Sequence, residues 1–120
     1  MTTSCCPAFI NLLKIHFPDQ YHENMSETLS PMAAVSRYLK AIHPDCVTVF
    51  IGPCMAKKSE SQEMGIEGNA DYVLSFGEFS SLLRSKDVKL EAEVSPYQEA
   101  YLWGKNFASS GGVANAVMEC

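Results

Sequence analysis

The sequence predicts an α/β fold, in which a lobe of parallel strands is flanked by helices. The first observation is an apolar, β-branched run at residues 46–51, Cys46-Val47-Thr48-Val49-Phe50-Ile51, which is typical of a strand covered on both faces. The second is a shorter run of the same kind at residues 71–74. The third is that helical patterns precede, separate and follow these two runs, an order that favours parallel pairing.

Two helices are expected before the first strand. Pro7 suits the first residue of a helix that ends near Pro18. Its apolar residues recur at helical spacing: Phe9, Ile10, Leu13 and Phe17. Residues 19–29 are polar with little periodicity, so no regular element is expected there. Ser30-Pro31 has the form of a cap and a first-turn proline for the second helix. The buried stripe of that helix is predicted to comprise Met32, Val35, Tyr38, Leu39 and Ile42.

Further helices are expected after the first strand. That strand stops at Gly52-Pro53, and a helix reaching about Met64 should follow. After the second strand, Ser75 and Glu78 have the spacing of a capping box. The helix that they begin carries Phe79, Leu82 and Leu83. Residues 88–90 are a candidate edge strand, residues 96–105 are predicted to be mostly loop, and a last helix should follow Ser109-Ser110-Gly111-Gly112 and continue through Val117.

The composition is that of one globular domain over residues 1–120. Hydrophobic residues make up 47% and charged residues 19%, and no apolar run reaches the length of a membrane span. The first residues show no basic segment followed by an apolar one, so no secretory signal is expected and the predicted location is cytoplasmic. The net charge is −5 and the basic residues are dispersed, which argues against a nucleic-acid partner.

Three of the five cysteines lie in turns before expected helices. Cys5 and Cys6 are adjacent at the first helix, and Cys54 follows the carboxyl end of the first strand, where open α/β sheets bind ligands. Iron–sulfur clusters need thiolates, which are stabilised by helix amino termini and by nearby cations. Lys57 supplies such a cation one turn after Cys54.

The residues alone leave three interpretations of these cysteines open. Structural thiols are favoured at this point, followed by an iron–sulfur site and then by zinc, because the CxxC pairs usual at zinc sites are absent. An odd number of cysteines excludes a complete set of intramolecular disulfides. Cys46 is expected to be a core thiol of the buried strand, and Cys120 a packing residue of the last helix.

The two thiol segments resemble the first two signature motifs of the iron-only (FeFe) hydrogenases. Thr3-Ser4-Cys5-Cys6-Pro7 with Phe9 resembles the motif TSCCPxW, and Pro53-Cys54 with Lys57 and Glu60 resembles MPCxxKxxE. The similarity extends to the helix start at residues 30–31 and to residues 71–79 and 107–113, so it spans nearly the whole chain.

The resemblance implies an H-cluster, which is a 4Fe-4S cubane bridged to a diiron unit that bears carbonyl, cyanide and dithiolate-amine ligands. Cys6 and Cys54 resemble two cubane ligands, and Cys5 the thiol that exchanges protons with the amine. Lys57 resembles the residue that hydrogen-bonds a cyanide ligand, and Glu60 its support. Ser26 matches a hydroxyl of the proton path. These roles suit the chemistry, since a thiol can give and take protons and an ammonium can hold an anionic ligand.

The departures from the family pattern predict a middle fragment of an H-cluster domain. The third cysteine motif and the upstream lobe have no match, so the isolated chain is expected to be inactive and to bind no cofactor. A cut face that exposes Cys5, Cys6, Cys54 and Lys57 would favour a dimer. Gly52 replaces the motif's methionine, Phe9 its tryptophan, and Met32 a glutamine of catalytic members. These changes favour a sensory-type branch.

The predicted parent is an oxidoreductase that reversibly oxidises hydrogen and reduces protons, with a ferredoxin-like electron carrier as partner. One alternative is a signalling protein that senses hydrogen or redox state. Another is a Nar-type assembly relative without hydrogen chemistry, against which the intact Cys5-Cys6 pair argues. Flanking domains would separate the first two. Cys6 and Cys54 are expected at one edge of the same sheet.

Overall fold

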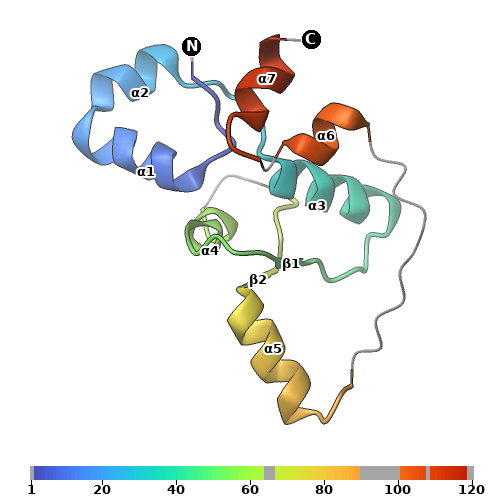
Figure 1. The fold of residues 1–120 in the computed structure, drawn as a ribbon. Coiled ribbons are helices and arrows are strands. Elements are labelled where there is room, and N and C mark those ends of the chain that lie inside the picture. The colour runs from blue at the N-terminus through green and yellow to red at the C-terminus, as the bar shows by residue number, and fades with distance from the viewer. Residues whose placement is uncertain (1, 64–66, 90–100, 108, 119–120) are drawn as a thin grey trace. The chain divides into compact units, whose positions relative to one another are not determined.

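The computed structural model describes residues 2–63, 67–89, 101–107 and 109–118. It divides into two compact units, Met1–Lys89 and Leu90–Cys120, each of which is described by itself. The elements of the first unit, in chain order, are α1 (Pro7–His16), α2 (Pro18–Asn24), α3 (Pro31–Ile42), β1 (Val49–Ile51), α4 (Ala56–Ser61), β2 (Tyr72–Leu74) and α5 (Phe76–Ser85) (Figure 1). Those of the second unit are α6 (Leu102–Asn106) and α7 (Gly112–Met118).

The two strands form a parallel pair, which confirms the α/β class. Phe50 lies opposite Val73 at the centre of the ladder. The N–H of Gly52 donates to the carbonyl of Leu74 at 3.0 Å and extends the ladder past β1. Helix α4 lies in the crossover between the strands and packs on both β2 and α1. The carboxyl end of β1 therefore leads directly into the segment that carries Cys54.

The first strand is shorter and more exposed than predicted. Pairing begins at Val49 rather than Cys46, and Val47, Val49 and Ile51 are exposed, so the strand is not covered on both faces. The backbone N–H of Thr48 explains the late start, because it donates to Asp71 Oδ2 at 2.7 Å instead of to a strand carbonyl. Cys46 is consequently half-buried and lies before the strand, which contradicts its predicted place in a buried strand.

Residues 19–29 contain a helix that the sequence pattern did not predict. Phe17 ends α1 with φ −138° and ψ 57°, and Pro18 begins α2 immediately. A proline at the first helical position is preorganised for such a restart, whatever the polarity of the residues that follow. Beyond α2, Thr2 pairs with Met25 in a parallel bridge.

Helix α3 begins as predicted, but it buries a different face. Ser30 caps it by accepting a hydrogen bond from Ala33 N at 3.3 Å. Of the predicted stripe only Met32 is buried, whereas the other four residues are exposed: Val35, Tyr38, Leu39 and Ile42. The buried residues on α3 include Ala33 and Ser36. Their side of the helix is held by hydrogen bonds from Arg37 and Lys40 to the carbonyls of Glu67 and Asn69, which the apolar periodicity does not reveal.

The later elements agree with the sequence in part. The capping box of α5 is present, with Ser75 accepting from Glu78 N and Glu78 accepting from Ser75 N. Helix α4 ends at Ser61, earlier than predicted, and Met64 lies outside the described residues.

In the second unit, α7 confirms the last helix, although Cys120 lies outside the described residues. Helix α6 contradicts the loop predicted for residues 96–105 at its described end. Of the candidate edge strand at 88–90, residues 88 and 89 form no strand and residue 90 is outside the described part.

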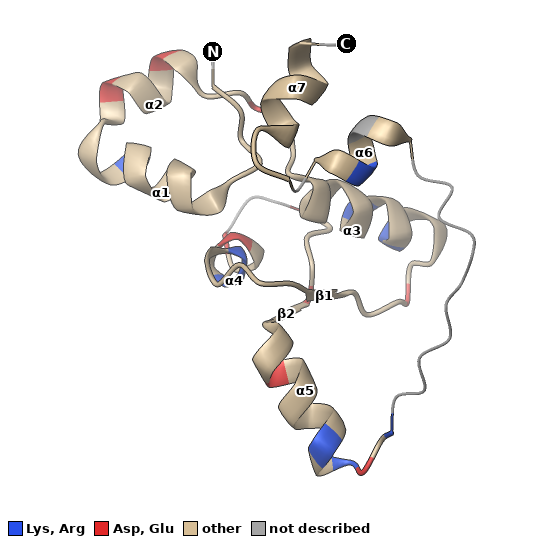
Figure 2. Cartoon of the chain, in the orientation of Figure 1, with Lys and Arg blue, Asp and Glu red and all other residues tan. Residues whose placement is uncertain are grey.

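Charged residues are spread over the elements. Figure 2 shows Lys and Arg on several separate helices rather than along one of them. Among the helices that the structure describes, none is both long and apolar enough to cross a membrane.

Candidate functional site

The first two candidate residues lie at the start of α1. Cys6 has the extended backbone of an N-cap, and its side chain makes no capping hydrogen bond. It is exposed, whereas Cys5 is half-buried with its Sγ 3.7 Å from Thr3 Oγ1. The thiol of Cys6 is thus free to meet a ligand.

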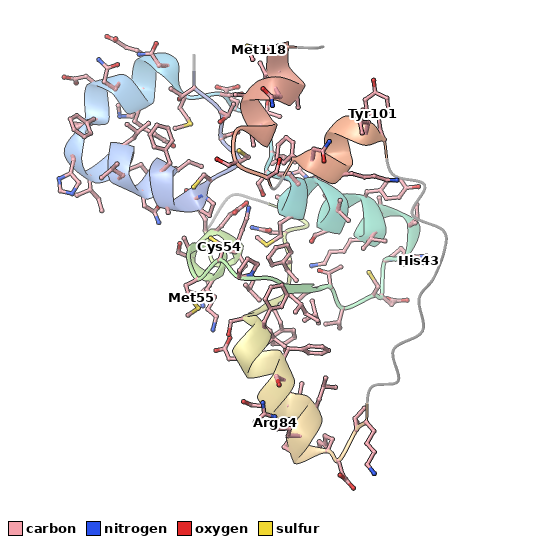
Figure 3. The ribbon with its side chains drawn as sticks, in the orientation of Figure 1. His43, Cys54, Met55, Arg84, Tyr101 and Met118 are labelled. Carbon is pink, nitrogen blue, oxygen red and sulfur yellow. The ribbon has the colours of Figure 1, made fainter. Side chains whose placement is uncertain are left out.

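The second candidate segment lies between β1 and α4. Cys54 is half-buried in the turn before α4, and Figure 3 shows it at the beginning of that helix. Its carbonyl accepts a hydrogen bond from Lys57 N at 3.3 Å, which ties the turn to the first turn of the helix. The sulfur of Cys54 and the side chain of Lys57 therefore belong to one short, ordered segment.

Lys57 is buried, which contradicts the prediction that it faces solvent. It is 8% exposed, and its Nζ lies 2.6 Å from the Oε2 of Glu60, itself 5% exposed. A buried ammonium is tolerated when a carboxylate neutralises it. Because α4 packs against both α1 and β2, residues 57 and 60 are enclosed rather than left on a free helix surface.

The two thiol segments meet through Lys57. Its Nζ also donates to the backbone carbonyl of Cys5 at 3.4 Å. Helices α1 and α4 lie against each other, with Asn11 Nδ2 donating to Ser59 Oγ at 3.2 Å. The segment of Cys5 and the helix that follows Cys54 are therefore neighbours. The predicted place of Cys6 and Cys54 at one edge of the same sheet is not found, because among the described residues the sheet consists of β1 and β2, and Thr2, in the segment before Cys6, forms only an isolated bridge with Met25.

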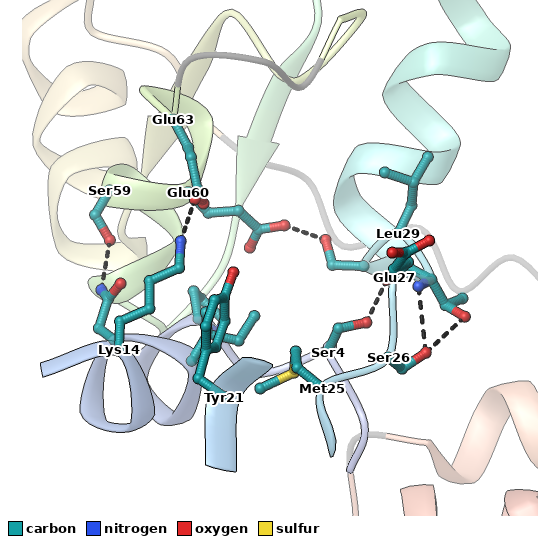
Figure 4. A pocket seen from close by; sticks show the side chains of 15 residues that line it. Ser4, Lys14, Tyr21, Met25, Ser26, Glu27, Leu29, Ser59, Glu60 and Glu63 are labelled. Atoms are coloured by element: carbon teal, nitrogen blue, oxygen red, sulfur yellow. Dashed lines mark hydrogen bonds and ion pairs between the residues drawn. The ribbon is translucent and has the colours of Figure 1, made fainter. Parts of the chain in front are cut away.

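A cavity of about 300 Å³ lies beside this ion pair (Figure 4). Glu60 and Ser26 both line it, together with Ser4 and Tyr21. The hydroxyl of Ser26 is 2.9 Å from Thr28 Oγ1 and accepts a hydrogen bond from Thr28 N at 3.2 Å. Ser26 thus shares a polar cavity with Glu60.

Two buried polar residues of the site were missed as such. Ser30 donates to Glu60 Oε1, and Asn69 Nδ2 donates to the carbonyl of Glu60 at 2.8 Å. The sequence revealed Ser30 only as a helix cap, and it carried no signal for Asn69, which contacts Glu60 from nine positions further along the chain.

The donor set suits an iron–sulfur group in part. Cys5, Cys6, Cys46 and Cys54 are all free thiols, and cysteine thiolates are the ligands of such clusters. Cys46 lies elsewhere, since it lines a second cavity between α3 and β1. Within the described part of the chain, no three His, Cys, Asp or Glu side chains converge on a point that could hold a metal ion.

Comparison with known proteins gives one consistent family. The sequence model for the family described as "Iron only hydrogenase large subunit, C-terminal domain" matches residues 1–120. Iron hydrogenase 1 of Clostridium pasteurianum is 27% identical over 135 aligned positions, which cover 98% of this chain and 23% of that protein.

A solved structure is also similar in fold. It is a structure of an FeFe-hydrogenase whose inactivation by oxygen is described as initiated by the modification and degradation of the 2Fe subcluster of the H-cluster. The TM-score is 0.61 at 28% identity, and the match covers 82% of this chain and 27% of the other. The chain thus spans about a quarter of the length of the proteins it resembles.

Proposed function

The chain belongs to the family of the C-terminal domain of iron-only hydrogenases, and from this we propose that it forms part of the H-cluster site of an FeFe hydrogenase-like protein. The protein would reversibly oxidise hydrogen and reduce protons, and it would exchange electrons with a ferredoxin-like carrier. The free thiols suit a reducing compartment, so we place this protein in the cytoplasm.

The observation that carries the proposal is the junction at Lys57. One ammonium is paired with Glu60 and donates to the carbonyl of Cys5, so the two motifs that the family resemblance identifies are in contact. Cys5 and Lys57 are 52 positions apart, so local secondary structure does not bring them together and the contact depends on the tertiary fold.

In this proposal Cys6 and Cys54 would be two of the cysteine ligands of the 4Fe-4S part of the H-cluster, and the remaining ligands would come from outside these two motifs. When bound, the H-cluster supplies the metal chemistry that interconverts dihydrogen and protons. The Lys57 ammonium would donate to an anionic cyanide ligand of the diiron unit, and Glu60 would orient that ammonium. Cys5 gives and takes a proton at its Sγ, and the Ser26 hydroxyl holds a place on the proton path.

The test uses the full-length protein loaded anaerobically with its cluster. Cys6→Ser and Cys54→Ser are expected to lose most of the bound iron and sulfide, the cubane EPR signal and the hydrogen-dependent reduction of a dye. Cys46→Ser is the matched control, because that thiol lines a different cavity, and it should stay within about twofold of the wild type. Retention of cluster iron in both Cys6→Ser and Cys54→Ser would refute the proposal.

A second candidate function is hydrogen or redox sensing, and residue 52 favours it. Gly52 stands where the family motif has a methionine, and a Cβ built there would lie 2.7 Å from Cε1 of Phe50. The Phe50 ring thus fills space that a larger residue 52 would need. Slow hydrogen turnover in a protein that also carries a signalling domain would favour sensing over bulk catalysis.

A further inference from the structure

The buried hydroxyl of Ser30 takes part in two hydrogen bonds. It is 4% exposed, and its Oγ donates to Glu60 Oε1 while accepting from Ala33 N at 3.3 Å. A serine hydroxyl has one proton and two lone pairs, so both contacts can exist together. The residue that begins α3 therefore also holds a side chain of α4.

Glu60 divides its two oxygens between two donors. Oε1 accepts from Ser30, and Oε2 accepts from Lys57 Nζ at 2.6 Å. The same Nζ reaches the carbonyl of Cys5 at 3.4 Å. A continuous line of contacts thus runs from Ser30 through Glu60 and Lys57 to Cys5, and it joins three segments far apart in sequence.

We propose that Ser30 is a positioning residue, which orients the Glu60 carboxylate so that Oε2 keeps the Lys57 ammonium against the Cys5 segment. Its relevance to the H-cluster depends on the proposed function, but the positioning itself is a property of this chain. Ser30 and Glu60 both line the cavity of about 300 Å³ shown in Figure 4. Without the hydroxyl, Oε1 would be hydrated from that cavity and the carboxylate could rotate, so Lys57 would lose a fixed partner.

The test follows the ammonium of Lys57 by nitrogen-15 NMR in the 120-residue chain. A buried, ion-paired ammonium exchanges its protons slowly enough to give a signal, and Lys57→Arg identifies that signal by its absence. Ser30→Gly should abolish the signal, because glycine removes the hydroxyl yet is nearly as good an N-cap. Ser30→Thr, which keeps a hydroxyl, should retain it.

Ser75→Gly is the matched control, since Ser75 is also a serine N-cap and its contacts are to Glu78 in α5. It should leave the Lys57 signal unchanged. A second measurement needs no substitution: the Ser30 hydroxyl proton of the wild-type chain should exchange slowly with water because it is held by a carboxylate.

Persistence of the Lys57 signal in Ser30→Gly, or rapid exchange of the Ser30 hydroxyl proton in the wild type, would overturn the positioning role. Either result would leave the cluster ligands Cys6 and Cys54 untouched. Conversely, failure of the iron and EPR test of those two cysteines would refute the proposed function and leave the Ser30 result standing.

Discussion

The ammonium of Lys57 donates a hydrogen bond to the backbone carbonyl of Cys5, 3.4 Å away and 52 residues earlier in the chain. The contact joins the loop before α1 to the helix after β1. Lys57 is also paired with Glu60 inside the fold. The same side chain therefore neutralises the buried Glu60 carboxylate and connects the two thiol segments.

Removal of Lys57 should destabilise the chain strongly. Lys57→Met would leave the Glu60 carboxylate buried without its cation, at a cost of about 3–5 kcal/mol in the free energy of unfolding. Lys58→Met is the matched control, since Lys58 pairs with Glu78 at 2.5 Å in a more exposed site and its loss should cost far less. Urea denaturation measures both. Equal losses in the two variants would contradict the burial of the Lys57–Glu60 pair.

Acid should weaken the fold through Asp71. The Lys40 ammonium, with the N–H and hydroxyl of Thr48, lowers the pKa of Asp71 from 3.8 to about 2. The charged carboxylate is therefore favoured in the folded chain, and its contribution is complete above pH 3.8 and lost as the pH falls to about 2. In urea denaturation across this range, the stability of Asp71→Asn should fall less than that of the wild type.

Glu78 should also contribute to the loss of stability in acid, and a variant of Glu78 separates its contribution from that of Asp71. The Lys58 ammonium, and then the Ser75 contacts, lower its pKa from 4.5 to about 2. Glu78→Gln should remove a further part of the acid loss. For the preceding prediction, an Asp71→Asn chain whose stability has the same pH dependence as the wild type would argue against the ion pair between Lys40 in α3 and Asp71 before β2.

Thiol labelling should distinguish Cys6 from the other described cysteines. Cys6 is exposed, whereas Cys5, Cys46 and Cys54 are half-buried, so brief treatment of the folded chain with iodoacetamide should modify Cys6 first. Peptide mapping by mass spectrometry assigns each site, and denatured protein shows the intrinsic rates. Faster labelling of Cys46 than of Cys6 would be incompatible with the exposure of the α1 cap.

Gly52 and Phe50 should be energetically coupled. A Cβ at residue 52 would lie 2.7 Å from Phe50 Cε1, so Gly52→Ala should cost about 1–3 kcal/mol through overpacking. In a Phe50→Leu background the same substitution should cost less, because the ring is gone. A double-mutant cycle by thermal or urea denaturation measures the coupling. If the effects of Gly52→Ala and Phe50→Leu on the free energy of unfolding were additive, the Phe50 ring would have moved away from the new Cβ without an energetic cost.

The 120-residue chain on its own should hold no stoichiometric cubane. The resemblance assigns two cubane ligands, Cys6 and Cys54, and a cluster of this kind needs four. Anaerobic reconstitution followed by iron and sulfide analysis and EPR checks this. Four irons per chain with a cubane signal would contradict the assignment.

Local signals in the sequence were enough to determine where several elements begin. Pro7 and Ser30-Pro31 mark the starts of α1 and α3, and the Ser75–Glu78 box marks that of α5, because each cap depends on residues within one helical turn. The apolar runs indicated two parallel strands, and the motif residues indicated the family, which the family match over residues 1–120 confirms.

Only the tertiary structure decided which of these residues are enclosed. Contacts between segments distant in sequence decide three features that periodicity did not reveal: the exposed face of α3, the late start of β1 at Val49 and the burial of Lys57. Ser30 is the clearest case, since its role as a cap is written in its neighbours while its bond to Glu60 requires α3 and α4 to pack together. Periodicity describes one element at a time, whereas burial is a property of pairs of elements, and so the first could be predicted and the second could not.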